Sequence, residues 1–319
     1  MPGGPPISAE DVKLTLANDY GIEELKSFRK ITKGLGNDLY VIKTEKGMYT
    51  LKIAVRNNSE RIHYEVDLLN HLRGLPTPRL VQTKEGKYLF RYKDHWGLIY
   101  PYLPGEEKEM FTDRMLREVG EALGKLHLQT QHFTSDVERT EFYNLSPQQV
   151  DEMLKIIGKT ISNPKIQKAI PQLTRTLGFG PPKTQQGAIH IDLKPENVLF
   201  TDEELTGIVD FDNSYIGPLV LDLANTVMWF SSKEGEFDTS AAKTIFDGYA
   251  SQRELPASEK ESFCDTLHYA FLSHMVIDIY YLALGLLPED YILWGIDNLL
   301  KTEQNLALRT NELKELLEV

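Results

Sequence analysis

Asp192, Asn197 and Asp210 are the residues in the middle of the chain whose types and spacing suit catalysis. Asn197 follows Asp192 by five residues, and Asp210 follows it by eighteen. Phosphoryl transfer needs a carboxylate that orients an attacking hydroxyl and accepts its proton, and oxygen ligands for Mg²⁺. We assign Asp192 to the first task, and Asn197 and Asp210 to the second. The pattern predicts phosphoryl transfer from a Mg²⁺–nucleotide complex, and the alternative is that these acids only cap turns.

The elements that must position these residues change character along the chain. Up to about residue 100, short segments with a period near two predict strands. These are residues 28–32, 38–44, 48–55, 77–81, 87–92 and 96–103. Ser59 caps one predicted helix among them, which ends before Pro76 and Pro78. The first hundred residues therefore predict a small sheet that carries one important helix.

The remainder of the chain predicts a mostly helical unit. Thr112 caps one helix, and residues 146–177 and 240–318 also have helical periodicity. Between them, residues 188–193, 196–200 and 206–211 resemble short strands joined by Asp-rich loops. We expect an α+β fold with an N-terminal lobe at 1–103, whose first eight residues form a loose tail, and a larger C-terminal lobe at 104–319. An Asp-rich cleft would separate the two lobes.

The motif H-x-D-x-x-x-x-N from His190 to Asn197, with the strand that carries Asp210 and the segment PLVLDLA at 218–224, resembles a known family. It is similar to the protein-kinase-like superfamily, and most similar to its aminoglycoside phosphotransferase and choline kinase branch. The resemblance extends from Lys33 to about Tyr281. It implies a two-lobed kinase fold and an ATP-dependent phosphotransferase with ATP and Mg²⁺ as cofactors.

The resemblance also implies roles for residues of the N-terminal lobe. Lys52, in the third predicted strand, matches the lysine that binds the α- and β-phosphates, and Glu65 matches the helix glutamate that pairs with it. The alternative for each alone is a surface charge. Gly34 and Gly36 are candidates for a turn that covers the phosphates, although the full G-x-G-x-x-G pattern is missing. An ordinary hairpin turn is the alternative there.

The connection between the lobes should offer backbone groups to adenine. Pro101 has no N–H, so the donor would be Tyr102 or Leu103.

In the C-terminal lobe, the resemblance makes His190 a structural anchor of the catalytic loop and Asp222 the acid that ties this loop down. Lys194, which follows Asp192 by two residues, would reach the γ-phosphate unless it is a solvated surface residue. Asp212 either assists the metal or faces solvent.

The acceptor is suggested by resemblance and by charge. Several stretches are closest to homoserine kinases, but residues 212–218 and Lys194 depart from that pattern. Residues 1–100 carry 16 Lys and Arg against 12 Asp and Glu, whereas residues 101–319 carry 19 against 35. No Lys or Arg occurs between Lys260 and Lys301. That window contains these acids and aromatics: Glu261, Asp265, Asp278, Glu289, Asp290, Asp297, Tyr269, Tyr280, Tyr281, Tyr291 and Trp294.

Acids and aromatics favour a small hydroxyl acceptor with an ammonium group, through ion pairing and cation–π contact. By resemblance homoserine is the best single candidate, whereas the charge pattern, which offers no Arg for a carboxylate, favours the alternatives: an aminoglycoside, an amino sugar or a choline-like alcohol. Solvated helix faces and core packing would also account for these residues. A protein Ser/Thr kinase is disfavoured because no conventional D-F-G or A-P-E segment follows Asp210. An inactive pseudokinase is disfavoured because the candidate catalytic residues are all present.

Composition excludes several other classes. The formal net charge of −12 disfavours binding to nucleic acid or to an anionic membrane. Cys264 is the single cysteine, so neither an intramolecular disulfide nor zinc spacing is present, and a reducing cytosol fits best. Residues 269–288 are apolar, but His274 and Asp278 within them favour a buried helix over a membrane span.

Overall fold

The N-terminal part of the chain forms an antiparallel five-stranded sheet in the order β1-β2-β3-β5-β4. The computed structural model describes residues 7–31, 37–54, 59–137, 139 and 145–318. The sheet strands are β1 (Leu25–Ile31), β2 (Asp38–Thr44), β3 (Gly47–Ile53), β4 (Phe90–Tyr92) and β5 (His95–Pro101). The first three confirm predicted strands, because their β-branched and aromatic residues suit a half-buried pleated surface.

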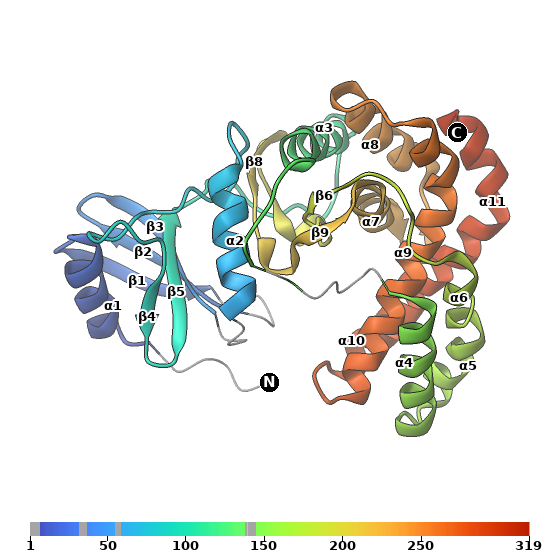
Figure 1. Cartoon of the computed structure of the whole chain (residues 1–319), viewed down its shortest axis with the longest axis horizontal. Helices are drawn as coiled ribbons and strands as arrows, with labels where there is room; N and C mark the ends of the chain where they lie inside the picture. Colours follow the sequence, from blue (N-terminus) through green and yellow to red (C-terminus); the bar gives the residue numbers. More distant parts are fainter. Residues whose placement is uncertain (1–6, 32–36, 55–58, 138, 140–144, 319) are drawn as a thin grey trace.

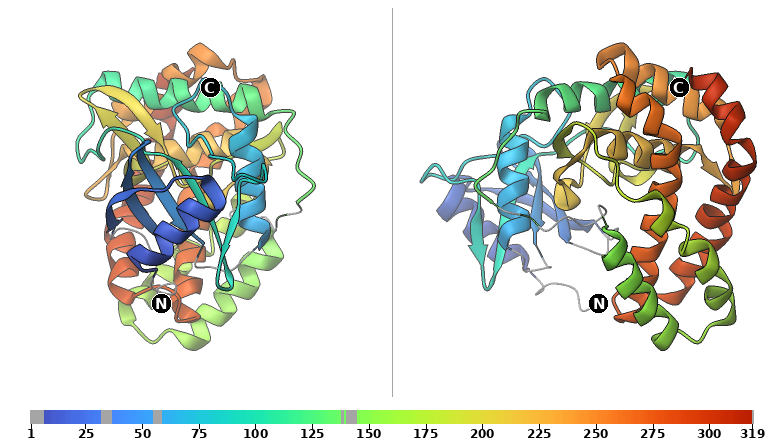
Figure 2. Two further views of the ribbon diagram at one scale, coloured as in Figure 1. Left: turned by 90° about the vertical axis from the view of Figure 1, so that its left-hand side faces the viewer. Right: turned by 45° about the vertical axis from the view of Figure 1, so that its right-hand side comes forward.

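Helices dominate the rest of the described chain, and Figure 1 shows all but α1 to the right of the sheet. The helices are α1 (Ala9–Thr15), α2 (Ser59–His71), α3 (Asp113–Thr130), α4 (Pro147–Thr160), α5 (Pro164–Leu173), α6 (Thr176–Phe179), α7 (Leu219–Ser231), α8 (Thr239–Gln252), α9 (Ala257–Ala283), α10 (Glu289–Gly295) and α11 (Lys301–Leu317). In Figures 1 and 2, α9 and α11 run side by side and frame the far end of the molecule.

Helices α1 and α2 pack on opposite faces of the sheet, which lies between them in Figure 1. Val12 of α1 belongs to a hydrophobic cluster with Leu51, whereas Ile62 of α2 packs in a second cluster with Leu98. Successive residues of a strand point to opposite faces. Lys52, next to Leu51, therefore points to the face that α2 covers.

Short two-stranded sheets lie among the helices of the C-terminal part of the chain. β6 (Gln186–Ile189) pairs with β9 (Tyr215–Pro218), and β7 (Val198–Thr201) pairs with β8 (Glu204–Ile208), all antiparallel. Two single turns of 3₁₀ helix, η2 (Pro195–Asn197) and η3 (Phe211–Asn213), join these strands. β10 (Ser232–Lys233) and β11 (Glu236–Phe237) form one further small hairpin. The mixed α+β architecture is the one that the sequence predicts.

Capping hydrogen bonds fix the starts of two helices. Thr112 accepts the predicted one from the Met115 N–H, and Ser8 accepts one from the Asp11 N–H. Ser8 is thereby the N-cap of α1, and Ile7 is buried, so the expected loose tail does not include these two residues. Residues 1–6 lie outside the described residues. The lobe boundary at residue 103 stays a prediction.

The strand predicted at residues 77–81 is wrong, because the chain there has no regular structure. Pro76 and Pro78 cannot donate to a ladder, and only the Val81 N–H reaches a neighbouring strand, at the Ile99 carbonyl 2.9 Å away. The strand predicted at 87–92 is confined to β4.

The apolar segment at 269–288 lies mostly within α9, whose described side chains are largely buried among α4, α7 and α11. No helix in the described part of the chain has the length and hydropathy to cross a membrane.

Candidate active site

A buried ion pair joins β3 to α2. The Lys52 Nζ lies 2.8 Å from Glu65 Oε1 and 2.7 Å from Oε2, and both residues are buried. Burial alone would lower the pKa of Lys52, but the carboxylates of Glu65, Asp212 and Asp210 outweigh it and raise that pKa. Burial raises the pKa of Glu65 to about 7 against the opposing effect of Lys52. The predicted pair is thus present, with its ammonium held by carboxylates.

The catalytic loop runs from the end of β6 to the start of β7. Asp192 is buried, and the Asn197 Nδ2 donates to its backbone carbonyl at 2.7 Å and faces its carboxylate Oδ2 at 3.4 Å. Because the amide nitrogen is used in this way, Oδ1 of Asn197 is the oxygen left to bind a cation. The five-residue spacing therefore brings the predicted catalytic acid and a predicted metal ligand together.

Backbone strain occurs next to Asp192. Ile191 has a φ of 61°, in the left-handed region that a β-branched residue rarely adopts. Its N–H donates to Asp222 Oδ1 at 2.7 Å, and the His190 N–H donates to Asp222 Oδ2 at the same distance. The His190 side chain contacts the Val209 carbonyl through Nε2 at 3.0 Å. These three contacts agree with the prediction that His190 anchors this loop and that Asp222 ties it down.

Asp210 follows β8 and also has a left-handed backbone, with a φ of 65°. Its side chain is exposed, yet the surrounding protein and the carboxylates of Asp212 and Asp192 raise its pKa against the effect of Lys52. A cation at this point would relieve the repulsion between these carboxylates. The donor set therefore suits a divalent metal.

No group of three or more His, Cys, Asp or Glu side chains that could hold a metal occurs among the residues described here. Mg²⁺ does not require one, because it typically takes one or two carboxylates and completes its coordination with phosphate oxygens and water. Asn197 and Asp210 remain the residues that would hold it.

Of the two environments predicted for Asp212, solvent exposure is wrong. It is buried, with Oδ1 3.6 Å from Lys52 Nζ and Oδ2 3.9 Å from Arg61 Nη1. Arg139 donates to the Ser214 carbonyl, and burial and the Arg61 guanidinium lower the pKa of Arg139 to about 10. Two arginines that sequence reasoning missed thus hold the turn that follows Asp210.

Lys194 is not a solvated surface lysine. Its Nζ lies 3.1 Å from Asp192 Oδ2 and 5.5 Å from the centroid of the Trp229 ring. Burial would lower the pKa of Lys194, but the carboxylates of Asp192 and Glu196 outweigh it and raise that pKa. A cation therefore sits beside the Asp192 carboxylate.

An aromatic and acidic cluster, here called the α7–α10 cluster, lies next to Lys194. Its members come from α7, α9 and α10, and they are Trp229, His274, Asp278, Tyr291 and Trp294. The Trp229 ring contacts the His274 ring edge-on, with 5.0 Å between the ring centroids. Trp294 stacks with both Trp229 and Tyr291, at centroid distances of 6.5 and 6.2 Å. His274 Nε2 lies 3.4 Å from Asp278 Oδ2.

Burial raises the pKa of Asp278, against the effect of His274. Lys194, which lies over the Trp229 ring and 3.1 Å from the Asp192 carboxylate, connects the cluster to Asp192.

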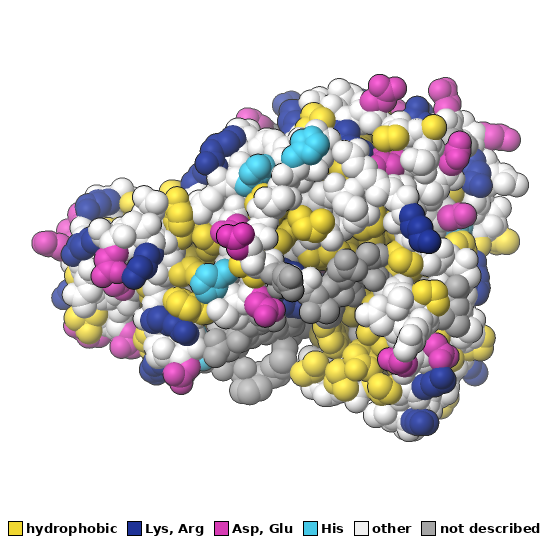
Figure 3. All heavy atoms as spheres, viewed as in Figure 1, with side chains coloured by type: hydrophobic (Ala, Val, Ile, Leu, Met, Phe, Trp, Pro, Cys, Tyr) yellow, Lys and Arg dark blue, Asp and Glu magenta, His cyan; other side chains and the backbone are white. Residues whose placement is uncertain are grey.

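The other acids and aromatics of the predicted acceptor window do not join this cluster. Glu261, Asp265 and Asp290 are exposed. Glu289 accepts from Asn163, and Asp297 pairs with Lys165. The Tyr269 ring is in the core, where its hydroxyl contacts the Leu145 backbone, and Tyr280 and Tyr281 are half-buried neighbours. Figure 3 shows hydrophobic side chains over the region of α10 and α4, where Trp294 remains 47% exposed.

One hydrogen bond distinguishes the two predicted adenine donors, Tyr102 and Leu103. The Tyr102 N–H donates to the Met48 carbonyl at 3.0 Å, as an extension of the pairing between β3 and β5. This N–H is therefore committed, and Leu103 is left as the predicted donor. Gly34 and Gly36 lie outside the described residues.

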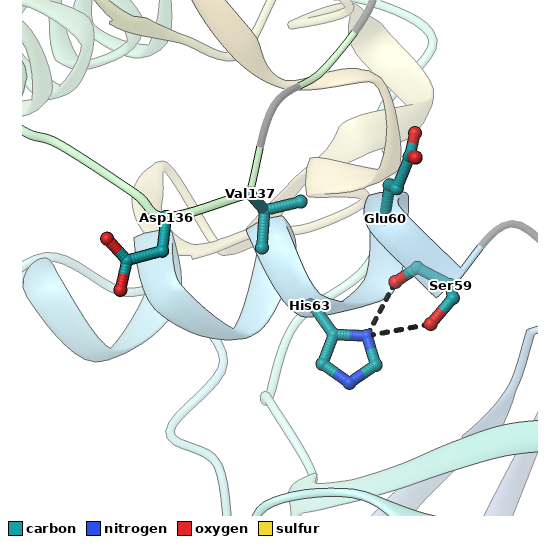
Figure 4. Close-up of a pocket in the computed structure, with 5 residues that line it drawn as sticks. All are labelled: Ser59, Glu60, His63, Asp136 and Val137. Carbon is teal, nitrogen blue, oxygen red and sulfur yellow. Dashed lines mark hydrogen bonds between the residues drawn. The ribbon is translucent and has the colours of Figure 1, made fainter.

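A shallow hollow of about 390 Å³ lies beside the start of α2, lined by Ser59, Glu60, His63, Asp136 and Val137 (Figure 4). The His63 ring bonds back to the Ser59 carbonyl at 2.6 Å. His63 and Glu65 are two residues apart on a helix with 3.6 residues per turn, so they point to opposite sides. This hollow is separate from the residues that surround Asp192.

The chain resembles known phosphotransferases over most of its length. Residues 27–257 match the model of the phosphotransferase enzyme family (APH). A homoserine kinase of Pseudomonas aeruginosa is 28% identical over 256 residues, which are 79% of this chain and 80% of that protein.

Two solved structures share the fold. An amicoumacin kinase in complex with AMP-PNP, Ca²⁺ and Ami has a TM-score of 0.66 at 19% identity, covering 98% of this chain and 94% of that one. A microcompartment-associated aminopropanol kinase has a TM-score of 0.65 at 17% identity, covering 96% and 98%. The predicted fold and the predicted phosphotransferase class are confirmed, and the chain belongs to the phosphotransferase enzyme family.

Proposed function

We propose that this protein transfers the γ-phosphoryl group of ATP to a hydroxyl group of a small molecule that carries an amine, with homoserine as the best single candidate. The observation that carries this proposal is the position of Asp192. Its carboxylate lies beside the Asn197 amide and the Lys194 ammonium. The α7–α10 cluster adjoins it. One carboxylate is thus shared between a phosphate-binding side and an acceptor side.

The nucleotide would bind along β3 and the connection that follows β5. Lys52, fixed by Glu65, offers its ammonium to the α- and β-phosphates, and the Leu103 N–H offers a donor to adenine. Asn197 Oδ1 and the Asp210 carboxylate would hold Mg²⁺. When bound, Mg²⁺ neutralises charge on the phosphate oxygens. These roles for Lys52, Leu103, Asn197 and Asp210 are proposals.

Asp192 would align the acceptor for direct attack. Its carboxylate accepts a hydrogen bond from the acceptor hydroxyl and takes up the hydroxyl proton as the new oxygen–phosphorus bond forms. The bond between the γ-phosphorus and the bridging oxygen breaks, and ADP leaves. Lys194 would stabilise the negative charge of the transferred group, because its ammonium already lies 3.1 Å from the Asp192 carboxylate.

The α7–α10 cluster supports an ammonium group on the acceptor. Asp278 supplies a buried carboxylate, and Trp229 supplies a ring face that already attracts the Lys194 cation. The relatives fit this chemistry by name. One is a homoserine kinase and another an aminopropanol kinase, and both acceptors carry an amine and a hydroxyl. A bulkier aminoglycoside or amino sugar and a choline-like alcohol are the remaining candidates.

The test is ATP consumption with a panel of acceptors: homoserine, 1-amino-2-propanol, choline, glucosamine, an aminoglycoside and a generic protein substrate. We expect turnover with a small amino alcohol, most efficiently with homoserine. Asp192→Asn should lower kcat by several orders of magnitude while ATP binding, measured by calorimetry, is retained. Labelling of the polypeptide alone, or near-normal turnover by Asp192→Asn, would refute the proposal.

A further inference from the structure

A chain of buried hydrogen bonds leads from the loop that contains Asp192 to Arg253 at the C-terminal end of α8. It begins at Asp222 of α7, whose two oxygens accept the His190 and Ile191 N–H groups. Asp222 is fully buried. The position of the strained Ile191, and with it that of Asp192, therefore depends on where this carboxylate is held.

His127 of α3 is the next member. Its Nε2 lies 2.9 Å from Asp222 Oδ2, and its Nδ1 lies 2.7 Å from the Tyr249 hydroxyl of α8. The Arg253 Nη1 in turn lies 2.9 Å from that hydroxyl oxygen. A guanidinium can only donate, so the Tyr249 oxygen accepts from Arg253.

The Asp222 carboxylate can only accept, so Nε2 of His127 carries a proton and donates to it. The Tyr249 oxygen accepts from Arg253, and burial raises the pKa of the phenol, so the hydroxyl keeps its proton. Arg253 and Tyr249 thus hold the His127 ring in the orientation in which Nε2 meets the Asp222 carboxylate.

Arg253 is itself fixed on two sides. It pairs with the fully buried Glu259 at 2.6 and 2.9 Å. Its Nη2 also donates to Gln185 Oε1 at 2.8 Å, and the Gln185 carbonyl accepts from the Leu219 N–H at the start of α7. Gln185 immediately precedes β6, the strand that leads into the loop with Asp192. Arg253 therefore holds the residue that joins the start of β6 to the start of α7.

Close packing of α3 against α8 makes the contact between His127 and Tyr249 possible. A Cβ atom added at Gly120 would lie 2.1 Å from the Ile245 carbonyl oxygen, and one at Gly248 would lie 2.5 Å from the Arg117 carbonyl oxygen. Side chains larger than hydrogen would force the two helices apart. The glycines therefore serve the hydrogen-bonded chain as well as the packing.

We propose that Tyr249 and Arg253 are positioning residues for phosphoryl transfer, which act on Asp192 through His127 and Asp222. Neither touches the groups that would contact substrate. The proposal rests on the proposed function for its kinetic consequence, but the geometry of the loop can be measured without any activity.

The test is Tyr249→Phe, which keeps the ring and removes the hydroxyl. We expect kcat to fall on the order of tenfold, with KM for ATP unchanged, because Lys52 and Glu65 lie outside the chain of hydrogen bonds. Hydrogen exchange of the His190 and Ile191 amides should accelerate at least tenfold, and the ¹⁵N resonance of His127 Nδ1 should shift. Arg253→Lys keeps the charge next to Glu259 but cannot hold Tyr249 and Gln185 as a fork, so its kcat should also fall.

The matched control is Tyr269→Phe, which removes an equally buried hydroxyl that contacts the Leu145 backbone. It should leave kcat and the exchange of the loop amides unchanged. The proposal is overturned if Tyr249→Phe keeps kcat within twofold, or if both tyrosine variants lose activity equally. It is also overturned if the loop amides exchange at the wild-type rate in Tyr249→Phe. A wild-type protein without kinase activity would refute the proposed function instead, and the exchange and ¹⁵N measurements would still decide this inference.

Discussion

Replacing Glu65 by Gln tests whether the buried ion pair sets the affinity for ATP. The substitution conserves shape and removes one negative charge from the site next to Lys52. Lys52 does not become unpaired, because the Asp212 carboxylate lies 3.6 Å from its Nζ. We therefore expect the lysine to be drawn toward Asp212 and away from the position that suits the nucleotide phosphates.

The magnitude follows from the two distances. With an effective dielectric constant of about 20, the Coulomb attraction of Lys52 is about 6.1 kcal/mol at the 2.7 Å separation from Glu65 and about 4.6 kcal/mol at the 3.6 Å separation from Asp212. The preference of Lys52 for Glu65 is the difference, about 1.5 kcal/mol, which corresponds to roughly tenfold in an equilibrium constant. The apparent Kd for ATP should rise by about that factor in Glu65→Gln.

The same pair predicts a pH dependence. Burial raises the pKa of Glu65 to about 7, so protonation below that pH neutralises the carboxylate and has the same effect as the substitution. In the wild-type protein, kcat/KM for ATP should therefore fall as the pH drops from about 8 to about 6. Glu65→Gln has no carboxylate to titrate at this position and should lack that part of the profile.

The assay is ATP titration at fixed acceptor concentration, with binding of a non-hydrolysable analogue measured in parallel. Glu60→Gln is a matched control, because Glu60 is an exposed residue of the same helix. An unchanged Kd in Glu65→Gln would refute the electrostatic reasoning. So would a wild-type profile whose acidic part persists in the variant.

Two further substitutions separate the phosphate side of the site from the acceptor side. Lys194→Ala should lower kcat about 10²-fold with ATP binding intact, because one charged donor to the transferred group is lost. An unchanged rate would exclude that role. Asp278→Asn should raise KM for an amino alcohol about tenfold but leave KM for ATP unchanged, whereas Asp290→Asn, on an exposed acid, should change neither. Equal effects on both substrates would place Asp278 outside the acceptor site.

Elements with a strong local signal were predictable. Ser8 and Thr112 cap helices because their hydroxyls satisfy N–H groups three residues ahead, a relation contained within one turn. The three strands at the start of the sheet have their own alternation. Residues 77–81 have β-branched and apolar residues too, but Pro78 within them and Pro76 just before them lack the N–H donors that a ladder needs. The missing backbone N–H groups therefore outweigh the strand-like side chains in this segment.

The acidic residues show where local reasoning ends. Asp278, Asp290 and Asp297 fall in one cation-free window, and nothing in their spacing tells them apart. In the fold, the first is buried beside His274, the second is exposed and the third pairs with Lys165. Helical phase within α9 and the approach of α7 and α10 decide this, and both depend on contacts between residues far apart in the chain.

The sequence by itself predicted the phosphotransferase class, because Asp192, Asn197 and Asp210 lie within nineteen residues and their types suit few other reactions. It also determined which elements carry Lys52 and Glu65. Only the tertiary structure decided that Asp212 shares Lys52, that Tyr102 is committed to Met48, and that Tyr249 and Arg253 connect to Asp222 through His127. The physical reason is that a hydrogen bond or an ion pair is set by atomic distances of a few ångströms, which a linear pattern does not contain when the partners are a hundred residues apart.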